Sequence, residues 1–182
     1  MEDYLIEFCS PTLASLKVGS LFNYAYASRQ ELTEQLKRLN ELLAEKGLFL
    51  RVLRVHKDRA LIYLCRRSQL VKLLHRPEIA RFLAEYGYIR LDLESVLWHL
   101  QCRVCSSEEF PHEIGIFLGY PLEDVEGFIR CNGRCSKCAG IWKVYGDAEA
   151  AQKLFAQYAK CRSVYRRLWQ EGRSVRQLTV AV

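Results

Sequence analysis

A histidine and a glutamate lie side by side in a short run that is otherwise rich in glycine, proline and large apolar residues. The run spans residues 110–121, and His112 and Glu113 follow its first proline. Prolines bracket the apolar residues 114–118, which predicts a short buried strand. His112 would then lie where the chain enters the core from a turn, and an imidazole can exchange a proton near neutral pH there.

A second candidate for chemistry is Cys9, two residues before a proline. Pro11 suits the first turn of a helix, which would place Cys9 or Ser10 at the helix start, where unpaired N–H groups and the helix dipole stabilise a thiolate. Papain-like peptidases combine a cysteine at a helix start with a histidine on a later strand. The order Cys9, then His112 agrees, and it predicts a nucleophile and a general base for hydrolysis or transfer of an amide or thioester.

A third residue would have to orient the imidazole of His112. Asp124, Asn132 and Asp147 are available downstream, and we favour Asp147 because it comes just after the next predicted strand. The alternative is purely structural, because free cysteines are often buried and core histidines are often simply hydrogen-bonded. Glu113 would then be a buried acid that holds a loop.

Five further cysteines have spacings that occur in metal sites. They are Cys102 and Cys105, followed by Cys131, Cys135 and Cys138. Four thiolates from two such groups can hold zinc or an iron–sulfur cluster. The interval between the two groups is longer than in a compact zinc ribbon, and the first pair lies on a predicted helix rather than in a turn. A redox or incidental role of these thiols therefore stays open.

Positive charge is concentrated at the C-terminal end of the chain. The net charge is +6, and residues 131–182 hold ten Lys or Arg against three Asp or Glu. Most of them follow residue 158, where Lys160, Arg162, Arg166, Arg167, Arg173 and Arg176 alternate with Tyr158, Tyr165 and Trp169. The two tyrosines share a face with apolar residues and are expected in the core, so we expect an acidic protein partner rather than nucleic acid, or simply a solvated helix face.

Composition predicts a globular protein with reduced thiols. Of 182 residues, 50% are hydrophobic, enough for a substantial core. No apolar run reaches the roughly 20 residues of a membrane-spanning helix, and the chain opens on Met-Glu-Asp, unlike a signal peptide. We therefore expect a cytoplasmic protein without a membrane partner, in which the eight cysteines are thiols or metal ligands rather than disulfides.

Helices and short strands alternate along the chain. The patterns predict helices over 28–47, 68–74, 77–86, 92–104, 122–129 and 147–168, and strands over 48–55, 60–64, 114–118, 141–145 and 178–182. Ser28 and Asp92 are the expected caps of their helices, and Asp147 is expected to start the last one. A hairpin and scattered strands favour an α+β fold, a single mixed domain over residues 1–182 with a small sheet flanked by helices. A papain-like architecture is one form that this fold would take.

Three motifs resemble those of a family of uncharacterised bacterial proteins, a domain of unknown function seen mainly in anaerobes. They are Cys-x-Pro-Thr-Leu-Ala at 9–14, the run at 110–121, and Gly-x-Trp-Lys-Val-Tyr at 140–145. Genes of that family often lie near flavodoxin and ferrous-iron uptake genes, so the resemblance implies redox or iron metabolism. Cys102 and Cys105 are not part of the family pattern.

Three functions remain as hypotheses. The first is a thiol-dependent hydrolase or transferase that needs no cofactor and acts on a small molecule or peptide. The second is a cysteine-ligated zinc or iron protein, or a redox protein, of iron metabolism, with an acidic redox partner such as a flavodoxin. The third is a basic interaction module.

Overall fold

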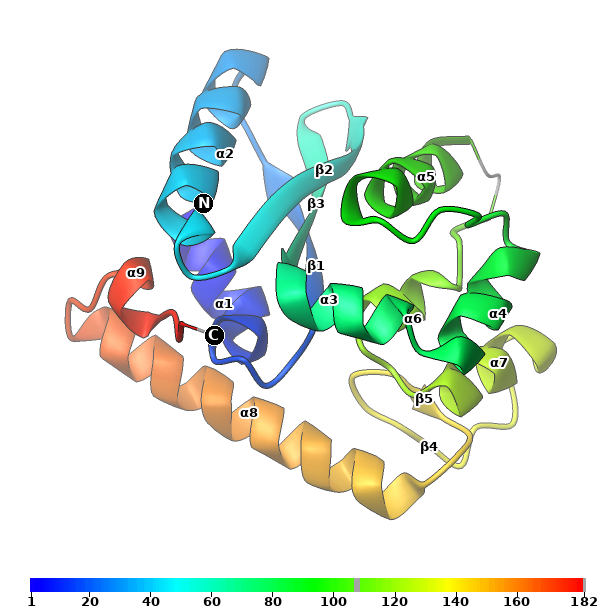
Figure 1. Ribbon diagram of the computed structural model, residues 1–182. Coiled ribbons are helices and arrows are strands. Elements are labelled where there is room, and N and C mark those ends of the chain that lie inside the picture. Colours follow the sequence, from blue (N-terminus) through cyan, green and yellow to red (C-terminus); the bar gives the residue numbers. More distant parts are fainter. Residues whose placement is uncertain (107–108, 182) are drawn as a thin grey trace.

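The computed structural model describes residues 1–106 and 109–181, and its central element is a three-stranded sheet (Figure 1). The sheet has the order β1 (Gly19–Ala25), β3 (Arg59–Arg66), β2 (Leu48–His56), and both pairs are antiparallel. A second, two-stranded sheet pairs β4 (Cys138–Ala139) with β5 (Lys143–Val144). The helices are α1 (Glu2–Leu13), α2 (Arg29–Ala44), α3 (Arg67–Leu74), α4 (Pro77–Glu85), α5 (Leu93–Ser106), α6 (Ile114–Phe117), α7 (Leu122–Arg130), α8 (Ala148–Gln170) and α9 (Val175–Leu178).

Helices cover both faces of the three-stranded sheet, and the central strand shows why. Successive side chains of a strand point to opposite faces. Ala60, Ile62 and Leu64 of β3 pack with α1 and α2, whereas Leu61, Tyr63 and Cys65 pack with the helices between α3 and α7. Both sets are buried. The predicted fold, a single mixed α+β domain with a small sheet flanked by helices, is confirmed.

Local capping signals placed three helices correctly. The backbone N–H groups of Glu31, Ser95 and Ala150 donate hydrogen bonds to the side chains of Ser28, Asp92 and Asp147, over 3.1, 3.0 and 3.0 Å. Each capping residue precedes its helix by one position. These side chains satisfy N–H groups that the first helical turn leaves unpaired.

The prediction that Cys9 or Ser10 starts a helix is wrong. α1 begins at Glu2, so Cys9 lies in its second half and Pro11 lies inside its last turn. Leu5, Cys9 and Leu13 recur every four residues and are fully buried, which makes one apolar helix face. This periodicity outweighed the proline signal.

Two predicted strands are also wrong. Residues 114–117 form the short helix α6 rather than a strand, and the predicted C-terminal strand 178–182 begins instead on the last residue of α9. Val180 donates its backbone N–H to the carbonyl of Leu13, while Val182 lies outside the described residues. An apolar run that is buried on all sides shows no periodicity, so its sequence cannot distinguish helix from strand.

A buried arginine joins three distant segments. Arg66, at the end of β3 and 1% exposed, donates from Nε to the Thr12 carbonyl over 2.6 Å, and from Nη2 to the carbonyls of Leu13 at 2.6 Å and Val180 at 2.9 Å. A cation suits the C-terminal end of a helix, where carbonyls are unpaired. Arg66 thus fixes the end of α1 and the C-terminal segment against the sheet.

The long helix α8 lies along α1 at one side of the molecule (Figure 1). Tyr158 and Tyr165 are buried, as predicted, and Arg166 and Arg167 are exposed. None of the helices in the described part of the chain combines the length and the apolar character that crossing a bilayer requires.

Candidate functional site

An aromatic cavity of about 390 Å³ lies where the run at 110–121 meets α7 and the β4–β5 hairpin. Its volume is within the range of small-molecule sites. Three polar side chains line it beside apolar and aromatic ones. The lining residues are Phe110, His112, Ile114, Gly115, Tyr120, Asp124, Val125, Phe128, Ala139, Gly140, Ile141, Trp142 and Lys143.

Asp124, a buried carboxylate on α7, holds the β4–β5 hairpin and the indole of Trp142 in place. Oδ2 of Asp124 accepts a hydrogen bond from Nε1 of Trp142 over 2.7 Å, and Oδ1 accepts from the backbone N–H groups of Tyr145 at 2.7 Å and Gly146 at 2.8 Å. Hydrogen bonds to an ionised acceptor are stronger than neutral ones. Asp124 therefore holds the hairpin on α7, and its two oxygens already have three donors.

The rings of the cavity are ordered by mutual packing. Tyr120 stacks on Trp142 with centroids 4.8 Å apart, and His112 meets Phe128 edge-on, also at 4.8 Å. Lys143 Nζ lies 6.0 Å from the centroid of the same Phe128 ring and donates to the carbonyl of Gly133. The imidazole and a full positive charge therefore border one aromatic surface.

The neighbour of His112 anchors the turn that carries it. Glu113 is 1% exposed and accepts from Nε of Arg103 on α5 over 2.8 Å, and from the hydroxyl of Tyr88 over 3.4 Å. The hydrogen bond to Glu113 raises the pKa of Arg103. Glu113 holds a loop, as the structural alternative expects, and thereby fixes the backbone of His112.

Close packing of the walls requires glycine at two positions. A Cβ added to Gly115 would lie 2.7 Å from Cγ2 of Val125, and one added to Gly127 would lie 2.5 Å from Cγ of Tyr145. Real Cβ contacts are longer than this, so a side chain at either position would push α6 or the hairpin away from α7.

Cys9 lies in a different part of the molecule from His112. Its side chain is 0% exposed in the core between α1, α2 and the sheet, and it does not line the aromatic cavity. Burial raises the pKa of the Cys9 thiol to about 12, against the opposing influence of Lys17 and of a hydrogen bond with Ser20. An activated nucleophile needs the opposite shift.

The preferred orienting residue is not beside the imidazole either. The side chain of Asp147 is occupied as the cap of α8 and does not line the cavity. Asp124, one of the two alternatives for this role, does line it together with His112. Asp124 nevertheless uses its oxygens to hold the hairpin.

The five cysteines with metal-site spacing fall into two groups, one on α5 and one between the end of α7 and β4. Cys102 and Cys105 are on α5, where the Cys105 thiol donates to the carbonyl of Leu53, and Cys131 and Cys135 precede the β4 residue Cys138. In residues 1–106 and 109–181 no three His, Cys, Asp or Glu side chains come together as a metal site would require. A bound zinc or iron–sulfur cluster stays a prediction.

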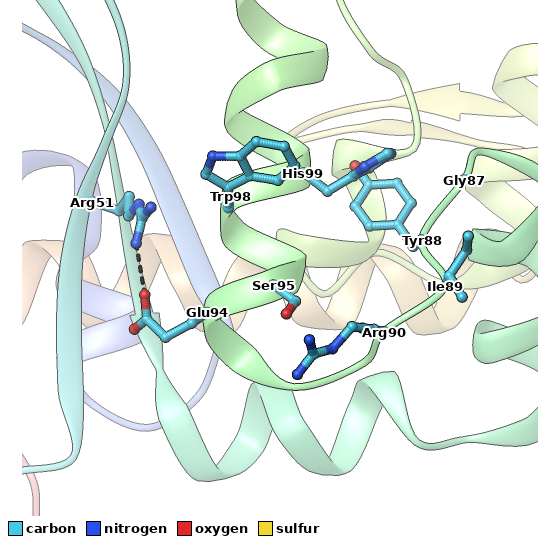
Figure 2. Close-up of a pocket in the computed structure, with 9 residues that line it drawn as sticks. All are labelled: Arg51, Gly87, Tyr88, Ile89, Arg90, Glu94, Ser95, Trp98 and His99. Atoms are coloured by element: carbon cyan, nitrogen blue, oxygen red, sulfur yellow. Dashed lines mark hydrogen bonds and ion pairs between the residues drawn. The ribbon is translucent and has the colours of Figure 1, made fainter.

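A second, more open cavity of about 480 Å³ lies between α5, β2 and the segment before α5 (Figure 2). Its charged and ring nitrogen groups already have partners, since Arg51 pairs with Glu94 at 2.8 Å and Nε2 of His99 lies 3.0 Å from the Tyr86 carbonyl oxygen. Trp98 is 60% exposed and Ile89 is 90% exposed. We therefore take the aromatic cavity, the less open of the two, as the candidate site.

Comparison with protein families gives one match, to the family described as "Protein of unknown function (DUF3793)", over residues 5–179. The chain belongs to this family. Membership in DUF3793 confirms the predicted assignment to a family of unknown function, while the bacterial and anaerobic origin stays a prediction. The match covers every residue of the aromatic cavity.

No curated protein and no solved structure matches the chain. The DUF3793 description names no activity, so an account of function has to come from the cavity itself. The papain-like architecture stays a prediction, although neither Cys9 nor His112 has the local structure on which it was based.

Sequence reasoning found His112 but missed most of the cavity. The rings of Phe128 and Trp142 and the ammonium of Lys143 come from segments that are adjacent only in the folded chain. A signal was present in the spacing of large aromatic residues between 110 and 142, but it could not show which of them share a wall.

Proposed function

We propose that the protein binds a small planar aromatic acid in the aromatic cavity. The observation that carries this proposal is the combination of stacked rings with a histidine and a lysine around a space of about 390 Å³. Ligand sites are typically apolar and aromatic cavities with a few placed polar groups. A planar ring would pack against Phe128 and Trp142.

The charges of the cavity favour an anionic group on the ligand. The negative charge of Asp124 is compensated by three N–H donors. Among the described residues, the ammonium of Lys143 has the neutral carbonyl of Gly133 as its acceptor and no carboxylate partner. A carboxylate on the ligand would therefore bind Lys143, with His112 as a second donor.

The thiol-dependent hydrolase or transferase has less support. It requires Cys9 to attack and His112 to accept a proton, but Cys9 is buried in another part of the core and no cysteine lines the aromatic cavity. The metal or redox alternative would use cysteines that also lie outside the cavity lining. Both remain hypotheses, and a binding function is the one that the geometry favours.

The proposal is tested by calorimetric titration with 2-naphthoate and with its neutral analogue naphthalene-2-carboxamide. We expect both to bind the wild type, and Lys143→Met to weaken naphthoate about 10-fold with little effect on the carboxamide, because only the charged pair is lost. Phe128→Ala should weaken both.

The matched control is Lys137→Met. Like Lys143, Lys137 is exposed and donates its ammonium to a carbonyl, that of Gly146, over 2.6 Å, but it does not line the cavity. Equal losses in the two lysine variants, or no binding of either compound to the wild type, would contradict the proposal.

A further inference from the structure

A smaller cavity of about 190 Å³ lies between α1, β1 and α8, and two basic side chains line it. They are Lys17 and Arg162, and within residues 1–106 and 109–181 no Asp or Glu lines it. Tyr120 and Ile141 belong to this cavity as well as to the aromatic one, so the two share a wall. Pro11, Tyr120 and Ile141 belong to the three sequence motifs and Arg162 to the basic C-terminal stretch, but the sequence did not show that they lie together.

Neither cation has a carboxylate partner in the part of the chain that the structure describes. The contrast with other arginines of α8 is direct, since Arg166 pairs with Glu7 and Arg167 with Glu171. Nε of Arg162 is buried and has no hydrogen-bond partner among the described residues. One N–H of the half-buried guanidinium therefore lacks the acceptor that a buried donor needs.

Lys17 shows the electrostatic consequence. Its Nζ lies 5.3 Å from the centroid of the Tyr120 ring, the one cation–π contact that it makes among the described residues. Burial and, to a lesser extent, the positive charge of Arg162 lower the pKa of Lys17 to about 8, against the opposing influence of Cys9. Two like charges are thus held near each other, and Glu7, a carboxylate whose pKa Arg162 helps to lower, is already paired with Arg166.

Two hydroxyl groups of the cavity are already engaged. The Tyr158 hydroxyl donates to the carbonyl of Leu16 over 3.2 Å, and Oγ of Ser20 lies 2.8 Å from Oγ1 of Thr12. The charged groups that line the cavity are the ammonium of Lys17 and the guanidinium of Arg162. Both are donors only, and together they match the charge and the acceptor oxygens of an oxyanion.

We propose that this cavity binds a phosphate group between Lys17 and Arg162. Its volume fits a small oxyanion or one group of a larger ligand, and it is below the range of sites that enclose a whole cofactor. The site is independent of the aromatic-acid proposal, because its charged groups do not line the aromatic cavity.

The pH dependence of binding is specific to this arrangement. Raising the pH above about 8 removes the proton of Lys17, so affinity for sulfate, which keeps its charge, should fall between pH 7 and pH 10. The pKa shifts of the neighbouring groups lead away from that window. Burial raises the pKa values of Cys9 and Tyr120 to about 12 and raises that of Tyr158, and the hydrogen bond with Arg166 lowers that of Glu7. The guanidinium of Arg162 is the other charged group that lines the cavity.

The test is calorimetric titration of the full chain with inorganic phosphate, sulfate and phenyl phosphate, combined with thermal unfolding. Lys17→Met and Arg162→Met are compared with Lys160→Met, which removes an equal charge from an exposed position on the same helix as Arg162. We expect the first two to weaken phosphate at least 10-fold and Lys160→Met to leave it unchanged. Tighter binding of phenyl phosphate than of phosphate would assign the group to a larger ligand, and the reverse to a free anion.

Unfolding measurements separate a lost site from a misfolded variant. Without phosphate, Lys17→Met should unfold at the same temperature as the wild type or higher, because it removes a poorly solvated charge. Phosphate should raise the unfolding temperature of the wild type but not of that variant. Absence of phosphate, sulfate and phenyl phosphate binding to the wild type, or an equal loss in Lys160→Met, would overturn the proposal.

Discussion

Single buried acids do most of the positioning around the aromatic cavity. Asp124 joins α7 to the hairpin that carries Trp142, and Glu113 joins the turn of His112 to α5. Each carboxylate is almost fully buried and each has its own donors, which is the condition under which a buried charge is tolerated. Asp124 and Glu113 thus hold in place Trp142 and His112, which we propose contact the ligand.

We expect Asp124→Asn to lower the free energy of unfolding by about 2–3 kcal/mol. The amide can still accept two hydrogen bonds, but its NH₂ group would face one of three N–H donors and leave both unpaired. Urea unfolding measures the change. Glu126→Gln, an exposed position on α7, is the matched control, and equal effects of the two substitutions would show that Asp124 does not hold the hairpin.

The reactivity of Cys9 decides between a structural thiol and a nucleophile. Since the thiol is 0% exposed and its pKa is raised to about 12, we expect Cys9 to alkylate more slowly than the exposed Cys135 at every pH from 6 to 9. Mass spectrometry of the alkylated peptides gives both rates. Fast alkylation of Cys9 that slows in His112→Ala would instead support the thiol enzyme.

Among the elements, those with local signals were predictable from the sequence. Ser28, Asp92 and Asp147 cap their helices as predicted, because a cap depends on residues within one turn. The hairpin of β2 and β3 is also confirmed. Its register shifts between Val52 and Arg54, a bulge that the alternation of residues did not locate.

Elements without local signals were not predictable. β1 has partners only in β3, some 40 residues away, and α6 is buried among segments that are remote in the sequence. The position of Cys9 was misjudged because Pro11 is tolerated inside the last turn of α1. The same holds for the aromatic cavity. His112 was predicted from the residues next to it in the sequence, whereas the other walls come from segments that are adjacent only in the folded chain.

The junction of α1, β3 and the C-terminal segment depends on Arg66. We expect Arg66→Met to lower the free energy of unfolding by about 2–4 kcal/mol, because the carbonyls of Thr12, Leu13 and Val180 each lose a hydrogen bond from a charged donor. Backbone N–H groups still donate to the first two carbonyls. Arg59→Met, at the exposed other end of β3, should change it by no more than about 0.5 kcal/mol. Chemical denaturation compares the two, and equal effects would remove Arg66 from this role.

At the scale of the whole molecule, the two faces of the three-stranded sheet pack against different sets of helices. One side packs α1, α2 and part of α8 into a core that includes Cys9, while the aromatic cavity lies on the other side, beside the β4–β5 hairpin. The proposed phosphate site lies between α1, β1 and α8 and shares Tyr120 and Ile141 with the aromatic cavity.

The most direct test of ligand binding in the aromatic cavity is the indole N–H signal of Trp142. The chain has three tryptophans, so ¹H–¹⁵N spectra contain three such signals, which Trp98→Phe, Trp142→Phe and Trp169→Phe assign. The proposal predicts that 2-naphthoate shifts the Trp142 signal, whose N–H donates to Asp124, and leaves Trp98 and Trp169 unchanged. A shift confined to Trp98, which lines the open cavity, or no shift at saturating naphthoate, would contradict it.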